Sequence, residues 1–404
     1  MHVDVIPVRL AIDGFRVIAT DDREDVVEVV IETMASAACC PDCGHATAHA
    51  KERRRLLVRD IPLRPGKQTW LVWWKRRFAC VRCGRTFTET HPEIPPRATH
   101  TRRFDRYLAA RATESPYARI ADEEGVTFYR IEMAARRDAN ELFASRDAAR
   151  PRRLCIDESA HRRGQIYNTI VSDPDAPRVI DMIETRHRRP LERYLVALPA
   201  SLRAGLEEVA IDMWEPYRLA IRAPLPEAQI VADRFHTERL VSRALDEARR
   251  AVQNAIRRAR GREHPSGAKR RLFYARHKLL RGSRRLTVSD LDELAALFEE
   301  HPDLLVAWEL MWSFRRIYAA PDRAEGQRRL RSWYADVEES GLRPFAVAAA
   351  MIFKWEDEVL AYFNSRLTNA YAEGATNKIK VIKRAGYGFR NFANFRRRVL
   401  VACG

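Results

Sequence analysis

The chain has 404 residues, of which 46% are hydrophobic, and its 72 Lys and Arg outnumber 55 Asp and Glu to give a formal net charge of +17. This hydrophobic fraction argues against a disordered protein, and the length predicts two or three domains. No apolar run approaches the roughly 20 residues of a membrane helix, so we expect no membrane association, and a polyanion is the first partner to consider.

Residues 1–96 contain short Val- and Ile-rich runs between turns, which predicts strands. They also contain two Cys-x-x-Cys-Gly knuckles, in which the glycine lets the backbone turn around a pair of thiolates. The four cysteines are Cys40, Cys43, Cys80 and Cys83. Four thiolates suit a closed structural Zn²⁺ site, so this segment is expected to form N-terminal strands and a zinc-binding ribbon. Cys39 is an alternative ligand.

Residues 97–150 are rich in Ala and Arg and have the pattern of two helices around a glycine turn at Gly125. Ser115 is expected to cap the first helix with Pro116 in its first turn, and Thr127 to cap the second. The second helix, from Phe128 to Arg137, would expose three arginines to a DNA major groove. They are Arg130, Arg136 and Arg137. A helix-turn-helix DNA-binding domain is favoured, and a plain helical linker is the alternative.

Residues 151–236 change to short apolar runs that alternate with helical pattern, which is typical of an α/β layout. Asp157, Asp212 and Asp233 each follow one of these runs. Carboxylates at strand ends can meet at one edge of a sheet, where a hard divalent cation such as Mg²⁺ relieves their repulsion. A metal site at this edge is therefore a hypothesis from the residues alone.

Residues 237–365 read as almost entirely helical, and a helix is expected again around Glu373. On that helix Glu373, Asn377 and Lys380 would share one face, which brings a third carboxylate beside groups able to contact phosphate. Five residues after Glu373 are candidates for DNA contact: Asn377, Lys378, Lys380, Lys383 and Arg384. The positive excess is concentrated in three blocks, with +8 over 51–96, +11 over 237–290 and +8 over 374–404.

Together these motifs resemble the zinc-finger-bearing bacterial insertion-sequence transposases of the ISL-three family, within the DDE, RNase H-like superfamily. The resemblance covers nearly the whole chain. It rests on the two knuckles, on Ile156-Asp157-Glu158, and on the runs at 211–217, 232–236, 373–380 and 386–392. It implies an N-terminal β/zinc-ribbon module, a helix-turn-helix, and an α/β RNase H-like catalytic core over 151–236 and 366–404. A large all-α insertion over 237–365 would interrupt the core.

The resemblance implies that Asp157, Asp212 and Glu373 form a catalytic triad that binds Mg²⁺ or Mn²⁺. Asp233 is the rival for the second position. Asp212 is preferred because it ends the fourth strand, where RNase H-like folds place that carboxylate. Asp233 and His236 then resemble the Asp/Cys-x-x-His element of related transposases, with His236 in a supporting role or simply buried and hydrogen-bonded.

The implied function is binding to the terminal repeats of an insertion sequence, followed by metal-dependent cleavage and transfer of DNA strands. The expected partner is double-stranded DNA, both element ends and target, bound by a homodimer or larger assembly at the bacterial nucleoid in the cytoplasm. Two alternatives stay open. One is a non-catalytic zinc-finger and helix-turn-helix regulator, and the other is an RNase H-like nuclease without strand transfer.

Overall fold

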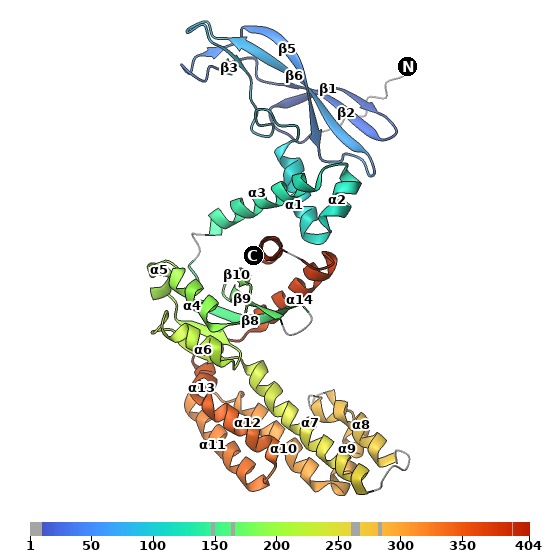
Figure 1. Cartoon of the computed structure of the whole chain (residues 1–404), viewed down its shortest axis with the longest axis vertical. Coiled ribbons are helices and arrows are strands. Elements are labelled where there is room, and N and C mark those ends of the chain that lie inside the picture. The colour runs from blue at the N-terminus through green and yellow to red at the C-terminus, as the bar shows by residue number, and fades with distance from the viewer. Residues whose placement is uncertain (1–9, 147–149, 163–165, 260–266, 282–284, 390) are drawn as a thin grey trace. The chain divides into compact units, whose positions relative to one another are not determined.

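The computed structural model describes residues 10–146, 150–162, 166–259, 267–281, 285–389 and 391–404 (Figure 1). The chain forms two compact units, Met1–Asp147 with Val381–Ala402, and Ala148–Lys380 with Cys403–Gly404. The segment 366–404, expected to complete one catalytic core, is thus divided between the two units. None of the described helices is long and apolar enough to cross a membrane.

The first unit begins with a five-stranded sheet. Its strands are β1 (Phe15–Asp22), β2 (Val26–Thr33), β5 (Ala50–Asp60), β6 (Gln68–Ala79) and β7 (Thr86–Thr88). The order is β1-β2-β6-β5, with β7 paired to the end of β6. β2 and β6 are parallel, and the other pairs are antiparallel. Alternate residues point into one core, where Val29, Ile31, Leu71 and Trp73 are fully buried.

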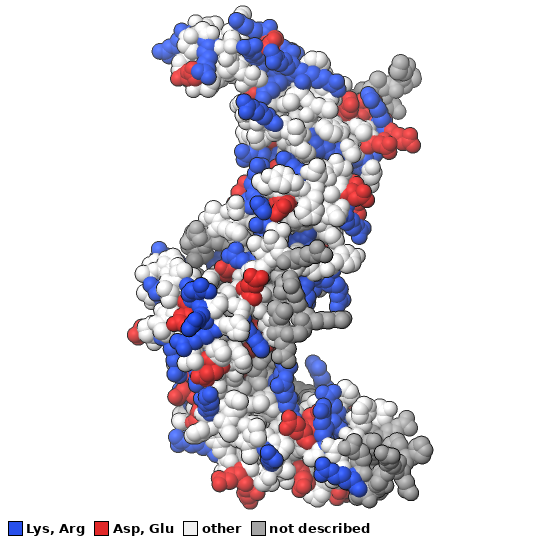
Figure 2. Space-filling view, in the orientation of Figure 1, with Lys and Arg blue, Asp and Glu red and all other residues white. Residues whose placement is uncertain are grey.

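The β5–β6 ribbon carries much of the positive charge of this unit. In Figure 2, Lys and Arg side chains gather over the region that Figure 1 labels β5 and β6. Ion pairs with β2 neutralise part of this charge. Arg53 Nη1 lies 3.6 Å from Glu32 Oε2, and Arg55 Nη2 lies 3.9 Å from Glu28 Oε2. A second, two-stranded sheet, β3 (Ala38–Cys39) with β4 (Ala46–Thr47), flanks the first cysteine knuckle.

Helices complete the first unit. They are α1 (Arg102–Glu114), α2 (Tyr117–Glu124), α3 (Phe128–Arg146) and α15 (Phe392–Cys403). α2 ends at Gly125, whose φ of 63° suits a left-handed C-cap. Thr127 then caps α3, because its hydroxyl accepts the N–H of Arg130 at 3.2 Å. The expected helix cap at Ser115 is wrong: the Ser115 N–H still bonds to Arg111 O and closes α1.

The second unit contains a mixed sheet of five strands. They are β8 (Arg153–Arg162), β9 (Ile166–Asp173), β10 (Arg178–Ile183), β11 (Glu208–Ile211) and β12 (Gln229–Ala232). The order is β10-β9-β8-β11-β12, with antiparallel pairing among β8, β9 and β10 and parallel pairing among β8, β11 and β12. Helices α4 (Arg188–Ala197), α5 (Ala200–Ala204) and α6 (Glu215–Arg222) connect the later strands.

Most of the other described residues of the second unit lie in helices. These helices are α7 (Arg234–Ala259), α8 (Gly267–Leu280), α9 (Val288–Glu300), α10 (Pro302–Ile317), α11 (Arg323–Ser340), α12 (Arg343–Lys354), α13 (Glu356–Ser365) and α14 (Ala370–Ala385), the last of which continues into the first unit. Trp333 and Trp355 are each 1% exposed, and Trp308 and Trp312 pack against the same core. These four side chains therefore serve packing, as their apolar surroundings indicate.

Candidate active site

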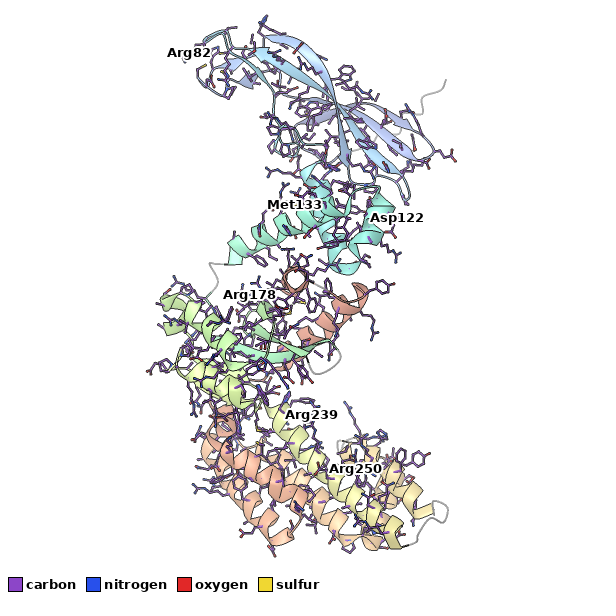
Figure 3. The ribbon with its side chains drawn as sticks, viewed as in Figure 1. Arg82, Asp122, Met133, Arg178, Arg239 and Arg250 are labelled. Atoms are coloured by element: carbon purple, nitrogen blue, oxygen red, sulfur yellow. The ribbon has the colours of Figure 1, made fainter. Side chains whose placement is uncertain are left out.

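The four cysteines of the two knuckles meet in the first unit. Their sulfur atoms lie within 4.8 Å of one another, with Cys40 Sγ 3.7 Å from Cys83 Sγ and Cys43 Sγ 3.5 Å from Cys80 Sγ. Cys39, the alternative ligand, is exposed and outside this group. Figure 3 marks the second knuckle by the label Arg82. A group of four thiolates suits tetrahedral Zn²⁺.

Both knuckles have the same backbone geometry. Gly44 and Gly84 have φ of 69° and 74°, and each donates its N–H at 2.9 Å to the carbonyl of the first cysteine in its pair. A residue with a Cβ would be strained at these angles. Backbone N–H groups directed at the sulfurs lower the pKa of Cys40 and of Cys80, the latter to about 7. For Cys40 and Cys80 this favours the thiolate, the form that binds zinc.

Three aspartates follow matched positions on neighbouring parallel strands of the second unit. Ile156 of β8 pairs with Ile211 of β11, which pairs with Ala232 of β12. The next residues along the three strands are Asp157, Asp212 and Asp233. All three are buried, with exposed fractions of 7%, 7% and 2%. The sheet therefore brings the three carboxylates together. Asp212 and Asp233 directly follow their strands as expected, but the expectation that a strand ends at Asp157 is wrong, because β8 continues to Arg162 through its pairing with β9.

Burial and mutual repulsion change the ionisation of these carboxylates. Burial raises the pKa of Asp157 to about 6, although hydrogen bonds from Glu158 N–H and the Thr376 hydroxyl oppose the rise. Burial also raises the pKa of Asp212 to about 9, and the negative charges of Asp157 and Asp233 add to the effect. An arrangement that penalises its own negative charge is one that a bound cation would stabilise.

Two oxygens of this cluster lack a hydrogen-bond partner among the described residues: Asp212 Oδ1 and Asp233 Oδ2. Asp212 Oδ1 lies 3.1 Å from His236 Nε2 without the alignment of a hydrogen bond, and Asp157, Asp212 and His236 can place ligand atoms within 4.8 Å of one another. The other oxygen of Asp233 accepts the Asn369 N–H at 3.0 Å. Orphaned carboxylate oxygens fit a hard divalent cation such as Mg²⁺ or Mn²⁺, for which oxygen ligands are preferred.

Glu373, expected as the third carboxylate, lies on α14 but outside the group of Asp157, Asp212 and His236. It is half-buried, and burial together with the charge of Asp233 raises its pKa. Thr376, three residues later on α14, donates its hydroxyl to Asp157 Oδ2 at 3.2 Å. Sequence reasoning missed Thr376, because no local pattern signals a contact between residues 219 positions apart.

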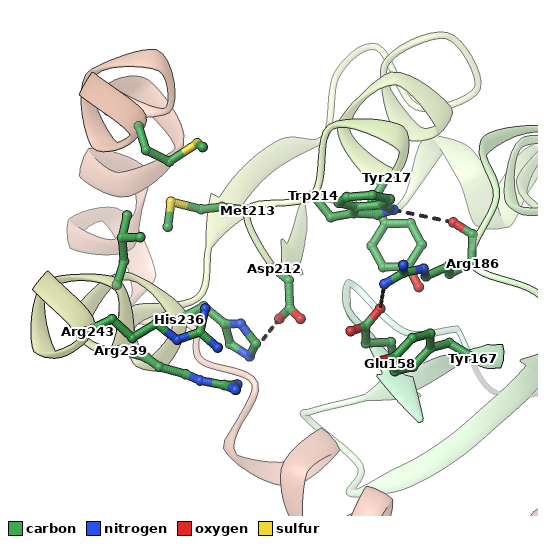
Figure 4. A pocket seen from close by; sticks show the side chains of 12 residues that line it. Glu158, Tyr167, Arg186, Asp212, Met213, Trp214, Tyr217, His236, Arg239 and Arg243 are labelled. Carbon is green, nitrogen blue, oxygen red and sulfur yellow. Dashed lines mark hydrogen bonds and ion pairs between the residues drawn. The ribbon is translucent and has the colours of Figure 1, made fainter. Parts of the chain in front are cut away.

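A pocket of about 370 Å³ lies beside Asp212. Figure 4 shows Asp212 between two walls, His236, Arg239 and Arg243 on one side and Glu158, Tyr167, Arg186 and Trp214 on the other. Arg186 Nη1 donates to Glu158 Oε2 at 3.1 Å, and its guanidinium lies 4.4 Å from the Tyr167 ring centroid and 4.8 Å from that of Trp214. Of the residues that line this pocket, Asp212 and His236 were the ones predicted from the sequence as site residues.

The arginines of α3 are held more tightly than the sequence indicates. Arg130 and Arg137 both bind the Asp105 carboxylate of α1, the latter at 3.0 Å. Arg136 pairs with Glu132 on the same helix at 2.8 Å. The side chains of Arg130, Arg136 and Arg137 are 30%, 47% and 58% exposed. Three other α3 side chains are exposed near its start: Phe128, Tyr129 and Met133, the last labelled in Figure 3.

The basic residues after Glu373 differ in exposure. Asn377, Lys378, Lys380 and Arg384 are exposed, and Lys383 is half-buried. Lys380 Nζ donates to Asn377 Oδ1 at 3.3 Å, so these two share a face as expected. Arg398 is buried in the first unit, where it donates to Ser115 O at 2.6 Å and lies over the Tyr117 ring.

Comparison with known proteins gives consistent matches along the chain. Residues 154–399 match the DDE, ISL3-type family model described as "Transposase", and residues 36–83 match the model "zinc-finger of transposase IS204/IS1001/IS1096/IS1165". The transposase for insertion sequence element IS1001 of Bordetella parapertussis is 25% identical over 372 residues, which cover 92% of this chain and 90% of that protein. The transposase for IS1557 of Mycobacterium tuberculosis is 28% identical over 255 residues, 59% of this chain and 57% of that protein.

Proposed function

The chain belongs to the ISL3 family of DDE transposases, and we propose that it binds the ends of an insertion sequence and catalyses metal-dependent cleavage and transfer of DNA strands. The observation that carries this proposal is the meeting of Asp157, Asp212 and Asp233 on three neighbouring strands, with buried carboxylate oxygens that lack partners among the described residues. The similarity to the IS1001 transposase along most of both chains supports the same function.

We assign metal binding to Asp157, Asp212 and Glu373, with His236 beside Asp212. The chemistry supplied by bound Mg²⁺ or Mn²⁺ is activation of water or a 3′-hydroxyl and stabilisation of the leaving oxygen. Asp157 is oriented by two hydrogen bonds, from Glu158 N–H at 2.7 Å and from the Thr376 hydroxyl. Glu373 lies on the same helix as Thr376. Burial and then the negative charge of Asp233 raise the pKa of Glu373, which supports its assignment to this cluster.

Asp212 is preferred to Asp233 as the second catalytic carboxylate. Asp212 follows β11, the fourth strand of the sheet, and one of its oxygens is buried beside His236 without a hydrogen bond. Asp233 already uses one oxygen to accept the Asn369 N–H. This interaction ties Asp233 to the start of α14, which suits a residue that positions the Glu373 helix.

The domain organisation we propose is a zinc ribbon over 1–96, a helix-turn-helix over 97–150 and an RNase H-like core over 151–236 and 366–404. Within the last segment, Val381–Ala402 belongs to the first compact unit. The sheet order supports the core, because it sets the first strand beside the fourth. Helices α7 to α13 follow one another with no strand among the described residues between them, which supports an insertion over 237–365. The grouping of the four cysteine sulfurs supports a structural Zn²⁺ site. The proposed assembly is double-stranded DNA bound by at least a dimer of the chain.

The test is incubation of the full chain with Mg²⁺ and DNA that carries both element ends. Wild type should cleave and join, whereas Asp157→Asn, Asp212→Asn and Glu373→Gln should each lower cleavage about 1,000-fold or more while DNA binding persists. Asp233→Asn, the matched control, should lose less than Asp212→Asn. Cleavage without joining would support the nuclease alternative, and binding alone the regulator. Wild-type cleavage by both Asp157→Asn and Glu373→Gln would refute this active site.

A further inference from the structure

Two arginines beside the carboxylates have no part in the chemistry proposed above. Arg239 and Arg243 lie on α7, line the pocket next to Asp212 and are exposed. Neither forms an ion pair within the part of the chain that the structure describes. Elsewhere on α7, Arg234 pairs with Glu238, and Arg249 and Arg250 pair with Asp246, so these guanidinium groups are neutralised by the fold.

The spacing of Arg239 and Arg243 places them together. Residues four apart on a helix lie on one face, and His236 precedes Arg239 on that face by one turn. Figure 4 shows both arginines beside His236, on the wall of the pocket that α7 forms.

Arg186 on the opposite wall is different. Its charge is matched by Glu158 at 3.1 Å, and its guanidinium lies over the Tyr167 and Trp214 rings. The Trp214 indole N–H also donates to Arg186 O at 3.4 Å, which adds a second contact between Trp214 and Arg186. The three arginines of the pocket therefore divide into one that the fold holds and two whose charge is available to a ligand.

We propose that Arg239 and Arg243 together hold one backbone phosphate of the DNA strand next to the phosphate that is cut, and so position that strand against the carboxylates. Arg186 shapes the facing wall and does not hold phosphate. Two guanidinium groups on one helix face can converge on a single phosphate through charge-assisted hydrogen bonds. They also offset the repulsion between a phosphodiester and the acidic cluster. This inference rests on the proposed function, because it takes the carboxylates as the cutting site.

The test compares the double variant Arg239→Gln/Arg243→Gln with Arg250→Gln, an exposed arginine of the same helix that is paired with Asp246 (Figure 3). The probe is an element-end duplex in which single phosphates near the cut are replaced, one at a time, by uncharged methylphosphonates. In wild type, one replacement should weaken binding about ten-fold. The same replacement should have no effect in the double variant. The slope of log affinity against log salt should fall by about one.

Binding is measured with Ca²⁺, so the result does not depend on cleavage. Arg250→Gln and Arg186→Gln should keep the wild-type pattern of methylphosphonate sensitivity, and Arg239→Lys/Arg243→Lys should keep the wild-type salt slope. The inference is overturned if the double variant retains the sensitivity of wild type at every position, or binds as well as Arg250→Gln. If wild type binds but fails to cleave with Mg²⁺, the proposed function fails while this measurement still decides the phosphate contact.

Discussion

Thr376 offers a sharp test of the proposed active site, because its hydroxyl contacts a catalytic candidate that the sequence did not connect to it. Thr376 Oγ1 donates to Asp157 Oδ2 at 3.2 Å, and the residue is 7% exposed. Valine has a similar shape and no hydroxyl. The change Thr376→Val therefore removes the hydrogen bond while α14 keeps its packing against the sheet.

The size of the effect follows from the contacts of Asp157. A hydrogen bond to a charged group contributes about 1.5–3 kcal/mol, and about 1.4 kcal/mol corresponds to a factor of ten. If this bond orients Asp157 in the transition state, its loss slows cleavage about 10- to 100-fold. The Glu158 N–H still holds the other carboxylate oxygen at 2.7 Å. The lower end of that range is therefore expected.

The assay is single-turnover cleavage of pre-bound DNA at saturating Mg²⁺, with thermal unfolding measured in parallel. Thr101→Val is the matched control, because the Thr101 hydroxyl donates to another buried aspartate, Asp60, at 2.6 Å in the first unit. That variant should lose stability but cleave pre-bound DNA at the wild-type rate. A Thr376→Val rate within about twofold of wild type, or an equal loss in Thr101→Val, would refute a positioning role for Thr376.

Two further predictions concern metal content and pH. Cys80→Ser should lose the bound zinc and unfold the ribbon, since structural zinc contributes about 10 kcal/mol or more of apparent binding free energy. Cys39→Ser should keep one zinc per chain by native mass spectrometry, and equal metal content in both variants would contradict the four-thiolate site. Burial first, and then the positive charges of Arg130 and Arg59, lower the pKa of His100 from 6.5 to about 4, so the folded state resists its protonation. The unfolded chain takes up this proton first, so stability is lost as pH falls from about 6.5 to about 4, by up to about 2 kcal/mol once partial exposure is allowed for. His100→Gln should reduce the difference in free energy of unfolding between pH 7 and pH 4.5, and an unchanged difference would contradict the assignment.

The carboxylate cluster could be predicted from the sequence because the patterns that indicate it are local. Buried parallel strands appear as short apolar runs, and in β8, β11 and β12 each run ends directly before an aspartate. Two matching Cys-x-x-Cys-Gly knuckles are equally local, since each glycine meets a backbone requirement of its own turn. Once β8 pairs with β11 in the register that sets Ile156 opposite Ile211, Asp157 and Asp212 become neighbours.

Tertiary contacts account for what the sequence could not show. Thr376 and Asp157 meet only because α14 returns to the sheet after the helical stretch, and no periodicity reports that return. Glu373 was expected within the metal-binding group, whereas the group among described residues contains His236 beside the two aspartates. Ser115 was expected to cap the start of α2, but it ends α1, because its backbone N–H bonds to Arg111 O. A residue type that suits the start of one helix can equally end the preceding helix.

Ion pairing bears on which of the positive charges are available to bind DNA. The arginines of α3 carry the charge expected of a DNA-reading helix, yet Arg130 and Arg137 share the Asp105 carboxylate. Moving either to a phosphate would require breaking an ion pair that the fold already makes, at a cost of about 1 kcal/mol or less for an exposed pair. Arg239 and Arg243 face no such cost among the described residues. A positive charge thus counts toward DNA binding to the extent that the protein's own carboxylates leave it unmatched, and the pocket beside Asp212 is where two such charges adjoin the proposed chemistry.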